Sequence, residues 1–141
     1  MTTVTILRVV TKILMPYILL FGLYVQFHGD FGPGGGFQAG VIFAAGIILY
    51  ALVYGLNSAI RIAPPVVLES LFALGVLIFA GTGVATMLMG GHFLDYNALS
   101  PHDPIHGQHW GLMAVEFGVG MAVASGMTLI YFAFAGRERV R

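Results

Sequence analysis

Glu116 is the residue whose type and position most directly suggest chemistry in this sequence. It follows Trp110 by six residues inside an apolar stretch, so a helix would carry it roughly 9 Å past the membrane interface. A carboxylate at that depth is costly if it faces lipid, and such groups usually face other helices and mark ion or proton pathways. Two interpretations stay open: Glu116 takes part in such a path, or it pairs with a neighbouring helix and only stabilises packing.

Three more titratable side chains are candidates for the same kind of path. Glu69 follows a Pro-Pro pair at the start of another apolar stretch. A helix N-terminus would stabilise its charge there, and Arg61 is near enough in sequence to pair with it. We expect capping or pairing, with a group at the mouth of a cation path as the alternative. His28 and Asp30 end the first apolar stretch, where they either titrate at a pathway mouth or belong to a turn that docks on a neighbouring subunit.

A polar interval from Gly91 to His109 contains four histidines and two aspartates: His92, His102, His106, His109, Asp95 and Asp103. The spacing of the last three histidines resembles a metal-ligand pattern, but that pattern works on a helix. We expect Pro101, Pro104 and Gly107 to interrupt any helix here, and we therefore predict no metal site. The interval is then either a group of side chains that titrate near neutral pH or a solvated loop docked on a neighbour.

A glycine-rich turn separates the first two apolar stretches. Its residues are Pro33, Gly34, Gly35, Gly36, Phe37 and, one helical turn later, Gly40. Proline lacks a backbone donor and glycine takes positive φ freely, so the chain should leave one helix, turn sharply and start another. From Gly36 the small residues recur at helical spacing through Gly40 and Ala44, which lets two helices approach closely in lipid.

Small residues also follow Glu116 at helical spacing. Gly120 and Ala124 lie in its own row, and a neighbouring row contains Gly118, Ala122 and Gly126. We expect this face to sit close to another helix.

The composition is that of an integral membrane protein. Of 141 residues, 58% are hydrophobic and 9% are charged, whereas about a quarter are charged in a soluble domain. A formal net charge of zero provides no basic surface for nucleic acid, and the absence of cysteine excludes disulfides and iron–sulfur clusters held by this chain. The sequence also lacks the Gly-x-Ser-x-Gly, HExxH and Walker motifs. We expect no catalytic chemistry and no cofactor.

About 20 apolar residues are needed for each membrane crossing. That length predicts four spans, at about 9–27, 37–56, 66–90 and 110–134, within a single membrane domain over 1–141. The expected fold class is an all-α integral membrane protein, a bundle of four transmembrane helices. Residues 57–65 are expected to form a short connector.

Every Lys and Arg falls on one side of this arrangement: Arg8, Lys12, Arg61, Arg137, Arg139 and Arg141. The positive-inside rule makes that side cytoplasmic, and both termini with it. The glycine-rich turn and the histidine-rich interval then share the outer face.

The segment from Phe21 to Asp30, followed by Pro33 to Gly40, resembles the signature of the MnhB-like family, a small membrane component of the Mrp-type (Mnh, Pha) multisubunit cation/proton antiporters. The resemblance extends over essentially the whole chain. Leu7 to Lys12 is similar to an N-terminal Leu-Arg-x-x-Thr-Lys motif, and Val115 to Val119 to an acidic-x-Gly-Val segment of the last helix. Relatives often carry Asp where this chain has Glu116, which is one methylene longer.

The resemblance implies an accessory but essential subunit of a multi-pass complex in the bacterial inner membrane, which exchanges Na⁺ or another monovalent cation for H⁺ in pH homeostasis. Its partners would be large subunits similar to the antiporter-like parts of complex I, other small membrane subunits, and the bilayer. The chain would contribute to assembly, with lining of the cation route as a further role. Two alternatives remain: a homologous subunit of a redox-driven complex such as a membrane-bound hydrogenase, and a stand-alone channel or carrier.

Overall fold

The structure is a computed structural model and describes residues 2–29, 33–100 and 103–137. The described residues form helices and connections without a strand: α1 (Thr2–His28), α2 (Gly36–Tyr54), α3 (Leu56–Ile62), α4 (Pro65–Leu88), the 3-10 helix η1 (Tyr96–Leu99) and α5 (Pro104–Arg137). Four of them, α1, α2, α4 and α5, are long and apolar enough to cross a membrane. The predicted all-α fold is therefore confirmed for the described residues, with four candidate membrane spans.

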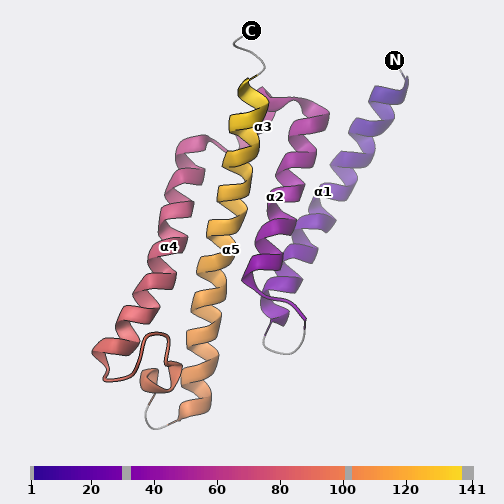
Figure 1. The fold of residues 1–141 in the computed structure, drawn as a ribbon. Helices are drawn as coiled ribbons and strands as arrows, with labels where there is room; N and C mark the ends of the chain where they lie inside the picture. Colours follow the sequence, from indigo (N-terminus) through magenta and orange to yellow (C-terminus); the bar gives the residue numbers. More distant parts are fainter. Residues whose placement is uncertain (1, 30–32, 101–102, 138–141) are drawn as a thin grey trace.

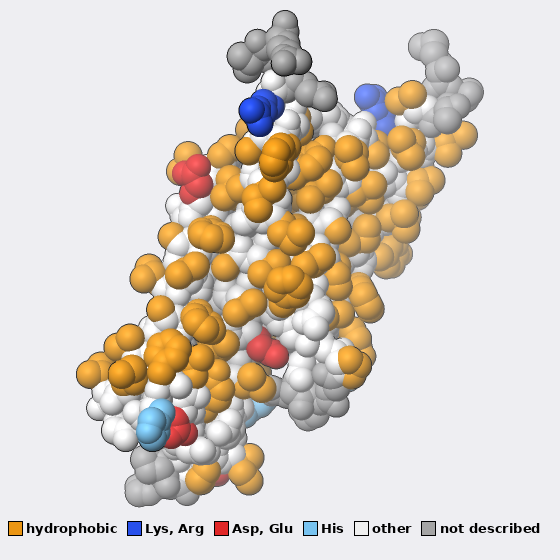
Figure 2. All heavy atoms as spheres, viewed as in Figure 1, with side chains coloured by type: hydrophobic (Ala, Val, Ile, Leu, Met, Phe, Trp, Pro, Cys, Tyr) orange, Lys and Arg blue, Asp and Glu red, His pale blue; other side chains and the backbone are white. Residues whose placement is uncertain are grey.

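Helix α5 lies at the centre of the bundle (Figure 1). It packs against α2 on one side and against α4 on the other, whereas α1 packs mainly against α2. Apolar side chains cover most of the face shown in Figure 2, and Lys and Arg gather at the end where the chain termini lie. Of the six basic residues, four lie in the described part, and all four are at this end: Arg8, Lys12, Arg61 and Arg137.

Two predictions about the connections were wrong. The connector expected at 57–65 contains a helix, α3, because a glycine with φ of 89° at Gly55 ends α2 and lets the next helix start at once. Pro104 does not interrupt a helix but begins α5, since the first position of a helix needs no donor from proline. Gly107 lies inside α5, where its missing side chain lets η1 approach: a Cβ there would lie 2.6 Å from the Tyr96 carbonyl oxygen.

Two rows of small residues make the close contacts of α5. In the row that faces α2, a Cβ on Gly40 would lie 2.7 Å from the carbonyl oxygen of Gly120. In the row that faces α4, a Cβ on Gly118 would lie 2.8 Å from the carbonyl oxygen of Gly75. Larger side chains would push these backbones apart. The predicted close approach is confirmed, and the two rows contact two different helices.

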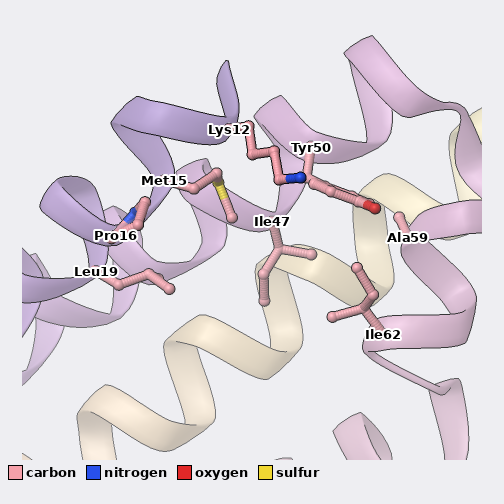
Figure 3. A pocket seen from close by; sticks show the side chains of 8 residues that line it. All are labelled: Lys12, Met15, Pro16, Leu19, Ile47, Tyr50, Ala59 and Ile62. Carbon is pink, nitrogen blue, oxygen red and sulfur yellow. The ribbon is translucent and has the colours of Figure 1, made fainter. Parts of the chain in front are cut away.

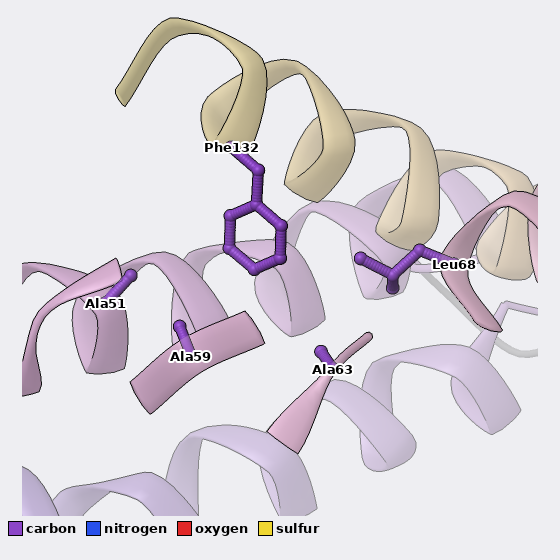
Figure 4. Packing of buried hydrophobic residues seen from close by; sticks show 5 residues of the cluster. All are labelled: Ala51, Ala59, Ala63, Leu68 and Phe132. Atoms are coloured by element: carbon purple, nitrogen blue, oxygen red, sulfur yellow. The ribbon is translucent and has the colours of Figure 1, made fainter. Parts of the chain in front are cut away.

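A compact cluster of buried side chains joins four helices near the basic end (Figure 4). Its members are Ala51, Ala59, Ala63, Leu68 and Phe132. Ala59 belongs to α3 and is fully buried, so α3 is part of the packed bundle and closes its basic end.

The segment between α4 and α5 is anchored by one buried hydroxyl. The Oγ1 of Thr86 lies 2.8 Å from the carbonyl oxygen of Gly83 and 3.0 Å from that of His92, and it accepts a hydrogen bond of 3.0 Å from the Leu94 N–H. Leu94 has φ of 62°, which is uncommon for a residue other than glycine. The anchored segment therefore has a defined shape and covers the end of α4 that is opposite the basic end of the bundle.

Candidate functional site

The glycine-rich turn and Glu116 form one site. A Cβ on Gly29 would lie 2.6 Å from both carboxylate oxygens of Glu116, and a Cβ on Gly35 would lie 2.9 Å from its Oε1. Gly36 packs against the backbone of the same residue, where a Cβ would overlap the Glu116 carbonyl oxygen. Three glycines of the turn region thus make room for one acidic residue of α5.

Each glycine of the turn is needed for a different reason. Gly35 has φ of 122°, a conformation that L side chains rarely adopt, and its N–H donates to the carbonyl oxygen of Val25 at 3.1 Å. Gly34 approaches the same oxygen, which would lie 2.8 Å from a Cβ at this position. Pro33 and Phe37 are exposed, so they are available to lipid or a neighbouring protein. In the described residues, this turn leads into α2, which begins at Gly36.

A small cavity adjoins the Glu116 carboxylate. Its volume is about 10 Å³, and its lining residues are Gln26, Phe27, Met113 and Glu116. That volume is at the lower limit for one water molecule. The amide of Gln26 reaches the interface of α5 with α2, where its Oε1 would lie 2.6 Å from a Cβ on Gly120. Carboxylate, amide and carbonyl oxygens are the ligands that hard cations prefer, and the carboxylate can also hold a proton.

Tyr96 of η1 lies on α5, on the side of this site away from the basic end of the bundle. Its ring packs against Gly111, and its Cγ would lie 2.6 Å from a Cβ there. Burial raises the pKa of the Tyr96 phenol, and the negative charge of Glu116 raises it further. The phenol therefore stays protonated well above neutral pH, and its O–H group can donate a hydrogen bond.

The other predicted path residues do not all join this site. His28 ends α1 next to Gly29, and its ring stacks on Tyr24 with centroids 5.1 Å apart. Asp30 lies outside the described residues. Glu69 is exposed at the start of α4, at the basic end of the bundle and away from Glu116. Within the described ranges no ion pair joins it to Arg61.

The histidine-rich interval contains no group of three potential ligands that could hold a metal ion, as far as the structure describes it; His102 lies outside the described residues. Asp103 instead caps α5. Its Oδ1 accepts from the backbone N–H of His106 at 3.3 Å, and its Oδ2 lies 2.8 Å from Nδ1 of the same residue. The side-chain hydrogen bond from His106, followed by the backbone one, lowers the pKa of Asp103.

The sequence interpretation missed Gln26 and Tyr96. A glutamine inside a predicted span is itself a signal, since an uncharged amide in lipid also seeks a partner. No local pattern pointed to Tyr96, because only the fold of the α4–α5 segment brings its ring onto Gly111.

These features define a class of protein: a multi-pass membrane protein with a half-buried carboxylate packed against a glycine-rich turn. A family model described as "Domain related to MnhB subunit of Na+/H+ antiporter" matches residues 6–129. The chain belongs to this family, as its resemblance indicated.

Curated relatives cover nearly the whole chain. The "Putative antiporter subunit mnhB2" of Staphylococcus haemolyticus (strain JCSC1435) is 32% identical over 133 residues, which cover 93% of this chain and 94% of the relative. The proteins of the same name from Staphylococcus epidermidis (strain ATCC 12228 / FDA PCI 1200) and Staphylococcus aureus (strain Newman) are each 31% identical, with the same coverage.

Proposed function

We propose that this chain is an accessory membrane subunit of a multisubunit Na⁺/H⁺ antiporter, and that Glu116 is its contact with the transported ion or proton. The family description and the relatives' names support the first part and favour a transporter component over an enzyme. The observation that carries the second part is the packing of the half-buried Glu116 carboxylate against Gly29 and Gly35, within an apolar helix. Acidic groups inside membrane helices commonly mark ion or proton pathways.

The location of Glu116 fits a role within a larger route. Glu116 lines a cavity whose volume is at the lower limit for one water molecule. This chain therefore supplies one binding position on the route and not a continuous channel. No lysine lies near Glu116, since the single lysine, Lys12, is at the opposite end of α1. A relay of lysine and glutamate side chains would therefore need residues of other subunits, and a stand-alone channel or carrier is disfavoured.

A second role is assembly with other membrane subunits. Helix α1 packs mainly against α2 and leaves large apolar side chains exposed, including Tyr17, Leu20 and Tyr24. These side chains suit lipid or the helices of partner subunits, both the large antiporter-like type and the small membrane type. Pro33 and Phe37 extend this surface at the turn, while His28 and Asp30 would meet partners on the outer face.

The basic end of the bundle is proposed to face the cytoplasm, in the inner membrane of a bacterium. The support is the common location of Arg8, Lys12, Arg61 and Arg137 together with the positive-inside rule. Both chain termini would then be cytoplasmic, with Glu69 at the cytoplasmic surface and Glu116 in the outer half of the membrane.

The experiment is to tag this chain, solubilise it gently from its own membranes, and identify co-migrating proteins by blue-native electrophoresis and mass spectrometry. Co-migration with large antiporter-like subunits, together with Na⁺-dependent proton exchange in vesicles, is the expected result. Nickel–iron or iron–sulfur subunits in the same band would assign the redox-driven complex instead. Migration alone would contradict the subunit role.

A further inference from the structure

A groove runs along one side of α1 at the basic end of the bundle. A cavity of about 330 Å³ lies between α1, α2 and α3, and it is lined by Lys12, Leu19, Tyr50 and Ile62 among others (Figure 3). A second cavity of about 260 Å³ also has Ile47 in its lining, but most of its lining residues belong to α2, α4 and α5. We call the first cavity the α1 groove.

The groove is apolar except at its basic end. Lys12 is the one charged residue in the lining of the first cavity, and Figure 3 shows its side chain extending toward Tyr50. In the part of the chain that the structure describes, no carboxylate lies within 4 Å of its amine. Arg8 and Arg61 lie at the same end of the bundle. A cation at the mouth of an apolar groove is complementary to an anionic head group that carries a hydrocarbon tail.

The dimensions of the groove suit a hydrocarbon chain. Lys12 to Leu19 spans about 10 Å along α1 at the helical rise per residue, which fits within one leaflet of a hydrocarbon core of about 30 Å. An α-helix with its side chains is about 10–12 Å across, too wide for a cavity of about 330 Å³. A single acyl chain can enter where a partner helix cannot.

We propose that the α1 groove is a binding site for an anionic phospholipid of the surrounding bilayer. One acyl chain lies against Leu19, Ile47 and Ile62, and the phosphate lies on the Lys12 amine. The lipid fills the space between α1 and α3, and so supports a helix that is otherwise packed mainly against α2. The α1 groove shares no lining residue with the cavity at Glu116, so it is distinct from the proposed ion contact.

The test is photo-crosslinking in the complex, in its own membranes. A diazirine amino acid is placed at Leu19, which lines the groove, and in a matched sample at Leu20, which points away and is 60% exposed. After illumination the tagged chain is denatured, and its adducts are identified by mass. We expect anionic phospholipid adducts at Leu19, lost with Lys12→Gln, retained with Lys12→Arg, and unaffected by Arg137→Gln. Blue-native gels of each variant establish that the complex is intact.

Two results would overturn the proposal. Cross-linking from Leu19 to another subunit would show that protein fills the groove. Adducts at Leu19 with the same lipid mixture as at Leu20, unchanged by Lys12→Gln, would show bulk lipid without a site. Both results are read on this chain itself, so they do not depend on exchange activity.

Discussion

The carboxylate oxygens of Glu116 lie 2.6 Å from the point where a Cβ on Gly29 would stand. Glu116 belongs to α5, whereas Gly29 directly follows α1 and is far from Glu116 in the sequence, yet a larger side chain at Gly29 would displace the Glu116 carboxylate. The glycine-rich turn is therefore shaped around the acidic side chain.

Replacement of Glu116 tests the ion contact. We expect Glu116→Gln to assemble normally but to lower Na⁺/H⁺ exchange about ten-fold or more, because an amide carries neither the charge nor the proton; ten-fold corresponds to about 1.4 kcal/mol in barrier height. Exchange is measured as Na⁺-induced dissipation of a pH gradient in inverted vesicles. Glu116→Asp keeps the carboxylate and should retain most of the activity. Full exchange by the Gln variant would leave Glu116 with a packing role alone.

Replacement of Gly36 tests the close contact of α2 with α5. In Gly36→Ala the added Cβ would overlap the Glu116 carbonyl oxygen, so we expect destabilisation of about 1–3 kcal/mol and less assembled complex. Gly81→Ala is the matched control, since nothing lies within 4 Å of its Cβ position and alanine favours a helix. Thermal unfolding of the purified complex and its abundance in membranes measure the difference. Equal stability of the two variants would mean that the turn is only a spacer.

Replacement of Thr86 tests how the segment between α4 and α5 is anchored. Thr86→Val removes the buried acceptor of the Leu94 N–H, and we expect a cost of about 1–3 kcal/mol together with faster proteolysis of the segment before η1. Thr82→Val is the control, because the Thr82 hydroxyl bonds only the carbonyl of Ile78 within its own helix. If both variants resist protease equally, the hydroxyl of Thr86 does not anchor the segment.

The cap at Asp103 predicts a pH dependence. Its pKa is lower in the folded protein than in the unfolded chain, so its contribution to stability is present above the ordinary carboxyl pKa of about 4 and is lost as the pH falls through the folded value. We expect the first turn of α5 to lose protection at acidic pH, measured as amide hydrogen exchange relative to the intrinsic rate at the same pH. Asp103→Asn can still cap but cannot titrate, so at acidic pH its first turn should be better protected than that of the unmodified chain. Identical pH profiles by mass spectrometry would exclude this role.

The orientation of the chain in the membrane can be measured by labelling single introduced cysteines, because the chain contains no cysteine of its own. His92 and Asn57 are exposed at the two opposite ends of the bundle. In intact cells, a membrane-impermeant maleimide should label His92→Cys and not Asn57→Cys, detected as a gel shift of the tagged chain. The reverse pattern would place the basic end outside.

The sequence was most informative where one physical pattern dominates. Apolar length located α2 and α4 within about two residues of the helices observed, at Gly36–Tyr54 and Pro65–Leu88. The rows of small residues predicted which helix faces are in contact, because small residues at helical spacing let two helices approach closely in lipid. The early start of α5 at Pro104 was not predicted, since the sequence alone does not distinguish a proline at the first position of a helix from one that interrupts a helix.

The sequence predicted the main residues of the site but not the contact between them. Glu116 and the glycine turn each stood out, but no local pattern stated that they touch, because that contact depends on how α2 packs on α5. Whether Glu69 would pair with Arg61 also depended on side-chain directions, and the two do not meet in the described structure.

The central location of α5 has a consequence for the order of membrane insertion. Helices α1, α2 and α4 precede α5 in the sequence, and α2 and α4 meet chiefly through it. Until α5 enters the membrane, the α1–α2 hairpin and α4 are two separate pieces with glycine-lined faces that have no neighbour. Quality-control proteases that recognise unassembled membrane segments could therefore cleave the chain until α5 has inserted. Shortened chains that lack α5 should be degraded rather than accumulate.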